Sequence, residues 1–401
     1  MKDDKKVPQL RFPEFTDAWK QRKFGEFVER KSDSALSSTS IPSVEYENVE
    51  SETGVLKKDI YVKTEFKKGV LFSDKDVLYG KLRPYLHNWL APSFTGVAVG
   101  DWWVLSPKNC SKDFLYRLLQ TLTFDEIANQ TSGTKMPRAD WNLVSSTAFY
   151  IPSSIEEQAK IGSLFNRIDS TITLQQRKLN SLQKLKKGLL QKMFPKNGEN
   201  IPEIRFPEFS DAWKQCKLSD LVNVIDGDRG KNYPTEADFE PHGHTLFLNA
   251  SNVTIDGFLF DTNQFITEEK SNSMGSGKII KDDIIITSRG SLGHIAWYND
   301  SVQQVMPHLR INSGMLILRN KANVKTSYLH QFMKSDKGKA QIVFMSFGSA
   351  QPQLTKKGVE SFTVNYPVDT EEQIKIGAFF SKLDNTITLQ QRWLFYTHKQ
   401  S

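Results

Sequence analysis

The sequence contains few cysteines and no long apolar run. Its two cysteines, Cys110 and Cys216, lie far apart and outside any CxxC or Cys/His spacing, which excludes a disulfide framework and a structural zinc cage. No stretch approaches the roughly 18 to 20 apolar residues that span a bilayer, and residues 1–15 lack the apolar core of a signal peptide. We therefore expect a cytosolic chain without a membrane partner, and its 401 residues are enough for two or three domains.

The sequence also lacks a complete catalytic or cofactor motif. Residues 273–279 resemble a phosphate-binding loop, but Ser273 replaces the first glycine and Ile279 replaces the Ser or Thr that would hold magnesium. His242 and His244 flank a glycine without a third ligand nearby, which is more typical of solvated loop histidines than of a metal site. We therefore expect no catalytic residue, no metal site and no cofactor in this chain.

Basic side chains exceed acidic ones by a modest margin, 53 against 46. Most of this excess lies in residues 156–194, which hold 8 basic and 3 acidic side chains. A basic balance favours a polyanionic partner, although an excess of this size is common and does not identify one by itself.

Two boxes of sequence occur twice in the chain. Residues 11–23 (RFPEFTDAWKQRK) recur at 205–217 (RFPEFSDAWKQCK) with 11 of 13 positions identical. Residues 156–177 recur at 371–392 with 15 of 22 positions identical. The stretches between the boxes share little sequence and differ in length. This pattern indicates a tandem duplication in which two near-identical frames each enclose a divergent insert.

The second box predicts a long helix in each half. Ser154 to Glu157 form a capping box, and residues 370–373 repeat it with Thr and Gln. Apolar residues then follow a 3.5-residue spacing over about 40 residues, roughly 60 Å of helix, which needs an equally long partner stripe. We predict that the two helices form an antiparallel coiled coil in which Gln175 and Gln390 share a polar layer; two ordinary surface helices are the alternative. The predicted interface residues are Ile161, Phe165, Ile168, Ile172, Leu179, Leu182, Ile376, Phe380, Leu383 and Ile387.

The inserts are predicted to be mixed and rich in β-strand. β-branched and aromatic residues alternate in short runs cut by Gly, Asp and Asn, and helical stretches follow at about 113–129 and 327–345. The predicted fold is α+β: two mixed α/β domains in a tandem pseudo-twofold repeat, joined by the two helices. The predicted segments are a first domain at 1–152 with its frame at 11–24, the first helix at 153–195, a linker at 196–204, a second domain at 205–369 with its frame at 205–218, and the second helix at 370–401.

Each insert carries two loops whose side chains suit nucleic acid. In each half a strand leads into a glycine-bearing loop with a basic residue, Arg83 in the first and Arg289 in the second. Another loop pair, 133–138 and 348–353, carries Arg and Lys in one half and Gln in the other. Arg and Lys suit guanine or phosphate, whereas Gln suits adenine, although an ordinary solvent-facing loop is the alternative for any single residue. The predicted DNA-binding residues are Tyr79, Lys81, Arg83, Lys135, Arg138, Ser288, Arg289, Gln351 and Gln353.

Taken together, these motifs resemble the specificity subunit of a type I restriction-modification system over essentially the whole chain. The resemblance is carried by the RFPEF…W openings, the two divergent inserts, the strand that ends at Arg289-Gly290 and the repeated helices. It implies that each insert is a target recognition domain that reads one half of a split DNA sequence, while the coiled coil holds the two apart.

The resemblance also implies partners and their chemistry. Two methylation subunits and, for cleavage, two restriction subunits that translocate DNA would assemble around this chain. Adenine methylation with S-adenosylmethionine and cleavage driven by ATP and Mg²⁺ would belong to those partners, so that this chain would not be an enzyme.

Two other functions remain as alternatives. A coiled-coil structural adaptor would explain the helices but not the duplicated frame around two different inserts. A stand-alone DNA-modifying enzyme would need a cofactor motif in at least one insert, and neither insert contains one.

Overall fold

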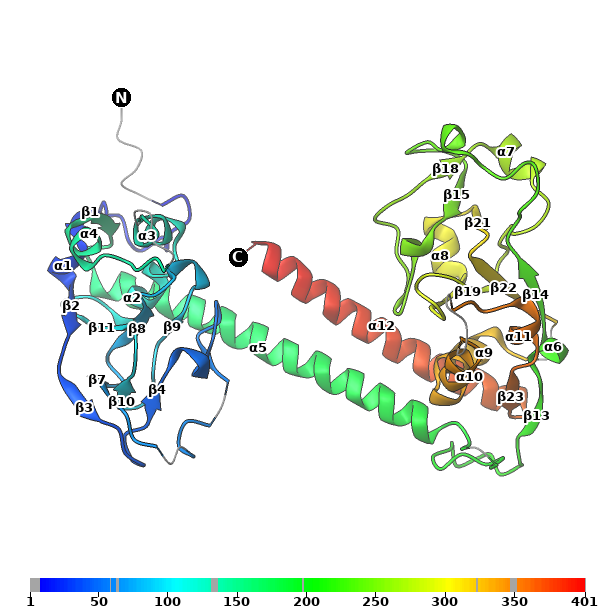
Figure 1. Ribbon diagram of the computed structural model, residues 1–401, viewed down its shortest axis with the longest axis horizontal. Helices are drawn as coiled ribbons and strands as arrows, with labels where there is room; N and C mark the ends of the chain where they lie inside the picture. Colours follow the sequence, from blue (N-terminus) through cyan, green and yellow to red (C-terminus); the bar gives the residue numbers. More distant parts are fainter. Residues whose placement is uncertain are drawn as a thin grey trace. The chain divides into compact units, whose positions relative to one another are not determined.

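The computed structural model divides the chain into two compact units, Met1–Thr173 and Leu174–Ser401 (Figure 1). Both units mix helices with sheets, so the predicted α+β class is confirmed. Within the described part of the chain, no helix is both long and apolar enough to cross a membrane. The structure describes residues 8–57, 59–62, 65–130, 136–196, 198–321, 324–346 and 352–400.

The first unit consists of two four-stranded sheets covered on one side by short helices. Its main strands are β1 (Lys20–Lys23), β2 (Val28–Lys31), β3 (Ser34–Leu36), β4 (Ser43–Val44), β7 (Lys68–Phe72), β8 (Val77–Gly80), β9 (Trp89–Leu90), β10 (Gly96–Ala98), β11 (Trp102–Pro107) and β12 (Ala148–Ile151). A small ribbon joins β5 (Val49–Glu50) to β6 (Val55–Leu56). Its helices are α1 (Phe24–Phe27), α2 (Lys112–Leu118), α3 (Leu122–Ala128) and α4 (Trp141–Ser146).

Both faces of the sheet β2-β11-β8-β9 are buried. Val77 and Tyr79 of β8 face the core that the sheet forms with the helices, whereas Leu78 faces the core shared with the sheet β3-β7-β10-β4. A strand buried on both faces shows a continuous apolar run instead of an alternation, which is the pattern of Val77-Leu78-Tyr79.

The second unit repeats this plan. Its sheet β14-β22-β19-β20 lies between helices on one face and the sheet β18-β15-β21 on the other. Its strands are β13 (Lys214–Lys217), β14 (Val222–Asp226), β15 (Thr245–Leu248), β16 (Val253–Thr254), β17 (Gly257–Phe258), β18 (Phe265–Ile266), β19 (Ile284–Thr287), β20 (Ile295–Trp297), β21 (Leu309–Ile311), β22 (Met315–Asn320) and β23 (Thr363–Tyr366). Its short helices are α6 (Leu218–Leu221), α7 (Glu268–Ser273), α8 (Asp300–Val305), α9 (Thr326–Lys334), α10 (Asp336–Ser346) and α11 (Lys356–Glu360).

The first frame is fastened to the start of the long helix α5 (Ile155–Lys192). The Arg11 guanidinium donates to both carboxylate oxygens of Glu157, at 2.7 and 2.8 Å, and the Trp19 indole donates to the same carboxylate at 3.1 Å. Glu157 is buried in the first turn of α5, where the helix dipole also favours a negative charge. Strand β1 then pairs with β12, which closes the unit beside the helix.

The second frame makes the same contacts. Arg205 binds both oxygens of Glu372 at 2.7 Å, and the Trp213 indole donates to Glu372 at 3.3 Å, in the first turn of α12 (Thr370–Gln400). Strand β13 pairs with β23 as β1 does with β12. In each unit, the first repeated box supplies an Arg and a Trp, and the second box supplies the Glu that both of them bind. We call this set of contacts the clamp.

The cap residue of α5 is the predicted one, whereas the cap residue of α12 is not. The Ser154 hydroxyl accepts from the Glu157 N–H at 3.3 Å, which is one of the two bonds of the predicted capping box, while the Glu157 carboxylate binds Arg11 and Trp19. In α12, the Asp369 carboxylate caps the helix by accepting from the Glu371 N–H at 2.8 Å, and Thr370 is already helical. The predicted cap at Thr370 is therefore wrong by one residue.

Within the second unit, α5 from Leu174 onward runs antiparallel to α12. The Gln390 side-chain amide donates to Gln175 Oε1 at 2.7 Å, and Lys186 forms an ion pair with Asp384. Gln175 precedes Lys186 in α5, whereas their partners Gln390 and Asp384 come in the opposite order along α12, so the two helices are antiparallel. The predicted polar layer of two glutamines is confirmed.

The residues of the predicted apolar stripe lie partly between the two helices and partly in the cores of the two units. Leu179 and Ile387 are buried, and Ile172, Leu182 and Leu383 are partly buried. Other positions of the stripe contribute to domain cores: Ile161 packs against the core of the first unit, and Ile376 and Phe380 belong to that of the second.

Phe165 and Ile168 lie in the part of α5 that belongs to the first unit, where they are 45% and 43% exposed, and their place in the helix interface stays a prediction. The Phe165 ring lies under the Arg117 guanidinium of α2, at 5.7 Å. The first turns of α5 are used to anchor the helix to its own unit, which a 3.5-residue spacing does not reveal.

We predict that Glu372→Ala destabilises the second unit by about 3 kcal/mol, because it leaves the Arg205 guanidinium buried without its counter-charge. Urea unfolding followed by circular dichroism measures the loss. The matched control is Lys375→Ala, which removes the exposed pair with Glu208 in the next turn of the same helix and should change stability far less. Equal losses in the two variants would contradict a structural role for the clamp.

Candidate nucleic-acid interface

In the first unit, the two loops predicted separately from the sequence lie side by side. The Arg83 N–H donates to the Pro137 carbonyl at 2.7 Å, and the Ala139 N–H donates to the Lys81 carbonyl at 2.9 Å. The loop after β8 and the loop before α4 therefore form one continuous surface, although more than 50 residues separate them in sequence.

Asp101 holds the basic side chains of this surface in place. The Arg138 guanidinium donates to its two carboxylate oxygens at 3.3 and 3.1 Å, and Lys81 Nζ lies 3.6 Å from it. The hydrogen bond from Arg138 lowers the pKa of Asp101, so the carboxylate is charged at neutral pH. The Tyr46 hydroxyl donates to the Asp101 carbonyl at 2.5 Å and accepts from the Leu82 N–H at 3.0 Å. Two cations and one anion are thus presented in a fixed arrangement.

The second unit has a corresponding loop pair. The Leu354 N–H donates to the Ser288 carbonyl at 3.0 Å, which matches the bond from Ala139 to Lys81 in the first unit. The Arg289 side chain, one residue further, is exposed, while Gln353 is partly buried beside Leu354. By this match Arg138 and Gln353 occupy equivalent positions and carry different chemistry.

A second arginine of this unit was missed by the sequence reasoning. The Arg229 guanidinium donates to the Ser313 carbonyl at 3.3 Å, and the Arg289 N–H donates to the adjacent Gly314 carbonyl at 3.2 Å. The two arginines therefore flank one turn. The only signal for Arg229 was its place in the glycine-bearing run Asp226 to Gly230, and Asp101 in the first unit had no signal at all.

Two of the predicted DNA-binding residues are buried. Tyr79 is 2% exposed and packs against the rings of Trp103 and Phe124, at 5.7 and 5.2 Å between centroids. Ser288 is also 2% exposed. Tyr79 belongs to β8 and Ser288 directly follows β19, and the burial of both side chains argues against the predicted contact with DNA. Lys135 and Gln351 lie outside the described residues.

The segment that resembles a phosphate-binding loop holds a carboxylate of the protein itself. The Gly275 N–H and the Gly230 N–H each donate to Asp228 at 2.6 Å. The Arg310 guanidinium donates to the carbonyls of Ser271 and Ser276 at 2.6 and 2.5 Å. Asp228 and Arg310 therefore hold this segment in place, and the Gly275 N–H binds a carboxylate of the protein where a phosphate-binding loop would bind phosphate.

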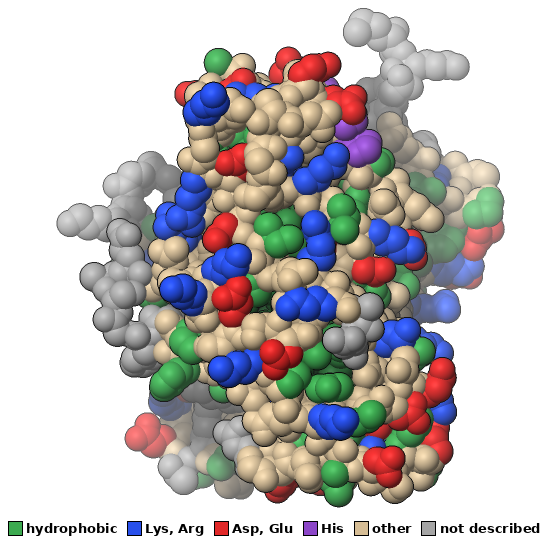
Figure 2. Space-filling model, turned by 90° about the vertical axis from the view of Figure 1, so that its right-hand side faces the viewer, with side chains coloured by type: hydrophobic (Ala, Val, Ile, Leu, Met, Phe, Trp, Pro, Cys, Tyr) green, Lys and Arg blue, Asp and Glu red, His purple; other side chains and the backbone are tan. Residues whose placement is uncertain are grey.

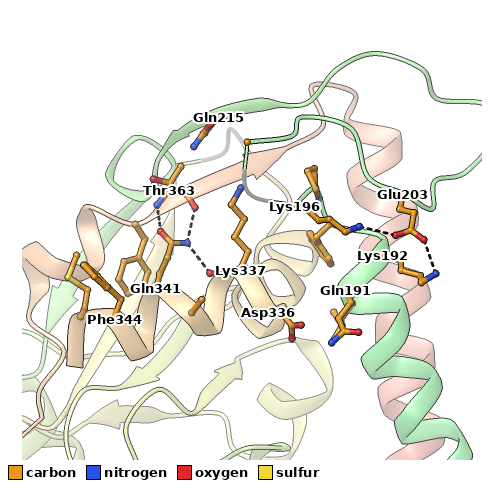
Figure 3. A pocket seen from close by; sticks show the side chains of 17 residues that line it. Gln191, Lys192, Lys196, Glu203, Gln215, Asp336, Lys337, Gln341, Phe344 and Thr363 are labelled. Carbon is orange, nitrogen blue, oxygen red and sulfur yellow. Dashed lines mark hydrogen bonds and ion pairs between the residues drawn. The ribbon is translucent and has the colours of Figure 1, made fainter. Parts of the chain in front are cut away.

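A cavity of about 1080 Å³ lies elsewhere in the second unit, between the end of α5, α10 and β23 (Figure 3). Among its polar side chains, Lys192 pairs with Glu203 at 2.7 Å, and the Gln341 side chain exchanges hydrogen bonds with the backbone of Thr363. None of the described residues predicted to bind DNA lines this cavity. On the face seen in Figure 2, Lys and Arg side chains are interspersed with Asp and Glu and do not gather into a single basic patch.

We predict that Asp101→Asn raises the affinity for non-specific DNA about two- to fivefold at low salt, because one negative charge leaves the basic surface. Discrimination between specific and non-specific DNA should fall at the same time, since Arg138 loses its anchor. Binding titrations at two salt concentrations measure both effects. Glu29→Gln, which removes an exposed carboxylate paired with Lys108, is the control. The same change in both variants would mean that only net charge matters.

Comparison with known proteins gives a consistent family assignment. The family model described as type I restriction modification DNA specificity domain matches residues 17–184 and 210–394, once in each half. The specificity subunit of the type I restriction enzyme MjaVIII from Methanocaldococcus jannaschii is 23% identical over 297 residues, which cover 72% of this chain and 67% of that protein.

Two solved structures share the fold. The S subunit of a type I restriction-modification system from M. genitalium aligns with a TM-score of 0.62 at 15% identity, over 97% of this chain and 95% of that one. A chain from a structure on the assembly and conformational transition of the type I R-M system aligns with a TM-score of 0.54 at 18% identity, over 98% and 96%.

Proposed function

Since the chain belongs to the type I restriction modification DNA specificity domain family, whose function is DNA sequence recognition in type I restriction-modification systems, we propose that each of its two units reads one half of a split DNA sequence. The observation that carries this proposal is the loop pair found in both units. The same backbone hydrogen bond holds it, from Ala139 to Lys81 and from Leu354 to Ser288. The side chains on it differ, as they must if the two halves read different bases.

The chemistry of the two surfaces suits different base edges. Arg138 and Lys81 can donate to the O6 and N7 of guanine or to phosphates, whereas Gln353 can pair with the N6 and N7 of adenine. Arg83, Arg229 and Arg289 supply further cations at the loops. Preorganisation by Asp101 favours specific contacts, because a held side chain loses less conformational freedom on binding.

In this proposal the chain is the non-catalytic member of a larger complex. Two methylation subunits and two restriction subunits assemble around it, and S-adenosylmethionine, ATP and Mg²⁺ bind to those partners. Family membership and the lack of cofactor motifs in the sequence support this division of labour. The purified chain alone would then bind DNA without methylating or cleaving it.

We predict that Arg83→Ala and Arg289→Ala each weaken specific binding by roughly 1 to 3 kcal/mol and that they affect different half-sites. The measurement is a titration of the assembled methyltransferase with DNA altered in one half-site at a time. Lys108→Ala, an exposed lysine paired with Glu29, is the control for loss of a positive charge. An arginine whose loss weakens binding equally on all sequences would be a phosphate contact.

We also predict that the helix pair sets the gap between half-sites. Inserting one heptad after Gln176 and one after Gln391 adds about 10 Å of helix, which corresponds to at most about three base pairs. Duplicating residues 170–176 and 385–391 for these inserts repeats the layer formed by Gln175 and Gln390 in register. A smaller shift is compatible with the proposal, because three base pairs also rotate the groove by about 100°.

The methylated sequence of the assembled heptad variant is the measurement. Four residues inserted in α5 alone form the mismatched control, which should lower stability or assembly because the stripes fall out of register. An unchanged gap in a folded double-heptad variant would show that the helices do not measure the spacer.

A further inference from the structure

The first unit exposes two large apolar side chains at the edge of its loop pair. Tyr85 is 52% exposed and Leu86 is 40% exposed, and both lie in the single 3₁₀ turn η3 (Pro84–Leu86). Met136, which precedes the Pro137 that binds Arg83, is also exposed. Three apolar side chains thus lie next to a surface whose other side chains are charged.

Backbone hydrogen bonds close this turn. Arg83 before it and His87 after it are both left-handed, with φ of 50° and 51°, a conformation that side chains other than glycine rarely adopt. The Leu86 and His87 N–H groups each donate back across the turn at 2.9 Å. The His87 ring stacks on Trp89 at 5.4 Å and bonds to Asp125 at 3.0 Å. The fold therefore stabilises a strained turn in which Tyr85 and Leu86 are exposed to solvent.

The second unit lacks this apolar tip. Its corresponding turn lies between Gly290 and Gly293, whose φ values of 71° and 78° are unstrained for glycine. Between them, Ser291 is small and polar, and Leu292 packs against the core of the unit. Among the described residues of these matching turns, the exposed apolar tip occurs in the first unit.

We propose that Tyr85 and Leu86 form a wedge that enters the DNA base stack and opens one base step in the half-site read by the first unit. Charge complementarity identifies the occupant: Arg83 directly precedes the turn, and Lys81 and Arg138 lie on the two adjoining loops around Asp101, so that cations exceed the single carboxylate and suit a polyanion. Proteins that kink a duplex combine such phosphate contacts with apolar side chains inserted between bases. This inference rests on the proposed function, because it assumes that this surface meets DNA.

Fluorescence of 2-aminopurine tests the wedge. The assembled methyltransferase is mixed with duplexes of the sequence that it methylates, each carrying one 2-aminopurine at a position other than the methylated base. We expect the wild type to raise the fluorescence several-fold at one step of the first half-site, because unstacking relieves quenching. The double variant Tyr85→Ala/Leu86→Ala should abolish this rise while it still binds the specific DNA. Ser291→Ala, at the matching turn of the second unit, should leave the rise unchanged.

Tyr85→Phe separates the ring from its hydroxyl group and should retain the signal if stacking is the cause. Specific binding by the wild type without a rise at any step would overturn the wedge and leave the proposed function intact. Sensitivity to replacing thymine by deoxyuridine, without a fluorescence rise, would likewise overturn it and indicate contact with a thymine methyl group. If the first unit discriminates no DNA sequence at all, the proposed function itself fails.

Discussion

The buried charge pair between each frame and its helix is the constraint on which the architecture depends. Arg205 and Glu372 are taken out of water together, and the indole of Trp213 satisfies a further lone pair of the carboxylate. Such a pair adds little net stability over apolar residues of the same shape, but removing either partner is costly. The pair therefore specifies where the frame must dock. Because the same contacts recur at Arg11 and Glu157, each unit grips the first turn of its own helix in the same way.

Because the same backbone hydrogen bond aligns the loops in both units, the side chains of these loops can differ between the units. The strand that ends near Lys81 and the one that ends near Ser288 both receive a hydrogen bond from a second loop, and neither bond involves a side chain. Side chains on these loops can therefore change without loss of the bond that aligns them. This is the physical reason why nearly identical boxes enclose inserts of unrelated sequence. It also explains why the reading surfaces are assembled from segments far apart in the chain.

The sequence predicted the repeated features better than the individual contacts. The start of α5, the layer of Gln175 and Gln390, and the loop pair of each insert follow from local patterns or from comparing the halves. Tyr79 was predicted as a loop residue, whereas it belongs to β8, a strand that is buried on both faces because a second sheet covers the face away from the helices. Asp101 was missed because it directly precedes β11, far from Arg138 in the sequence, and only the fold brings the two together.

The register of the helix pair depends on its polar residues, since an apolar stripe repeated every seven residues tolerates a slip by one heptad. Such a slip would place Gln175 opposite Leu383 or Thr397 and deprive it of its amide partner. It would also separate Lys186 from Asp384, whose second carboxylate oxygen accepts from Gln331 of α9 at 3.0 Å.

Burial opposes the charge on Asp384, yet Lys334 and Lys186 together hold the pKa of this carboxyl below its usual value. A slipped helix would leave that charge without Lys186 in a poorly solvated place. Because Gln331 and Lys334 belong to a helix of the second unit's own domain, the same carboxylate that fixes the register also fixes α12 against that domain. In this unit, the contacts of Asp384 therefore fix both the register of the two helices and the position of α12 against the domain.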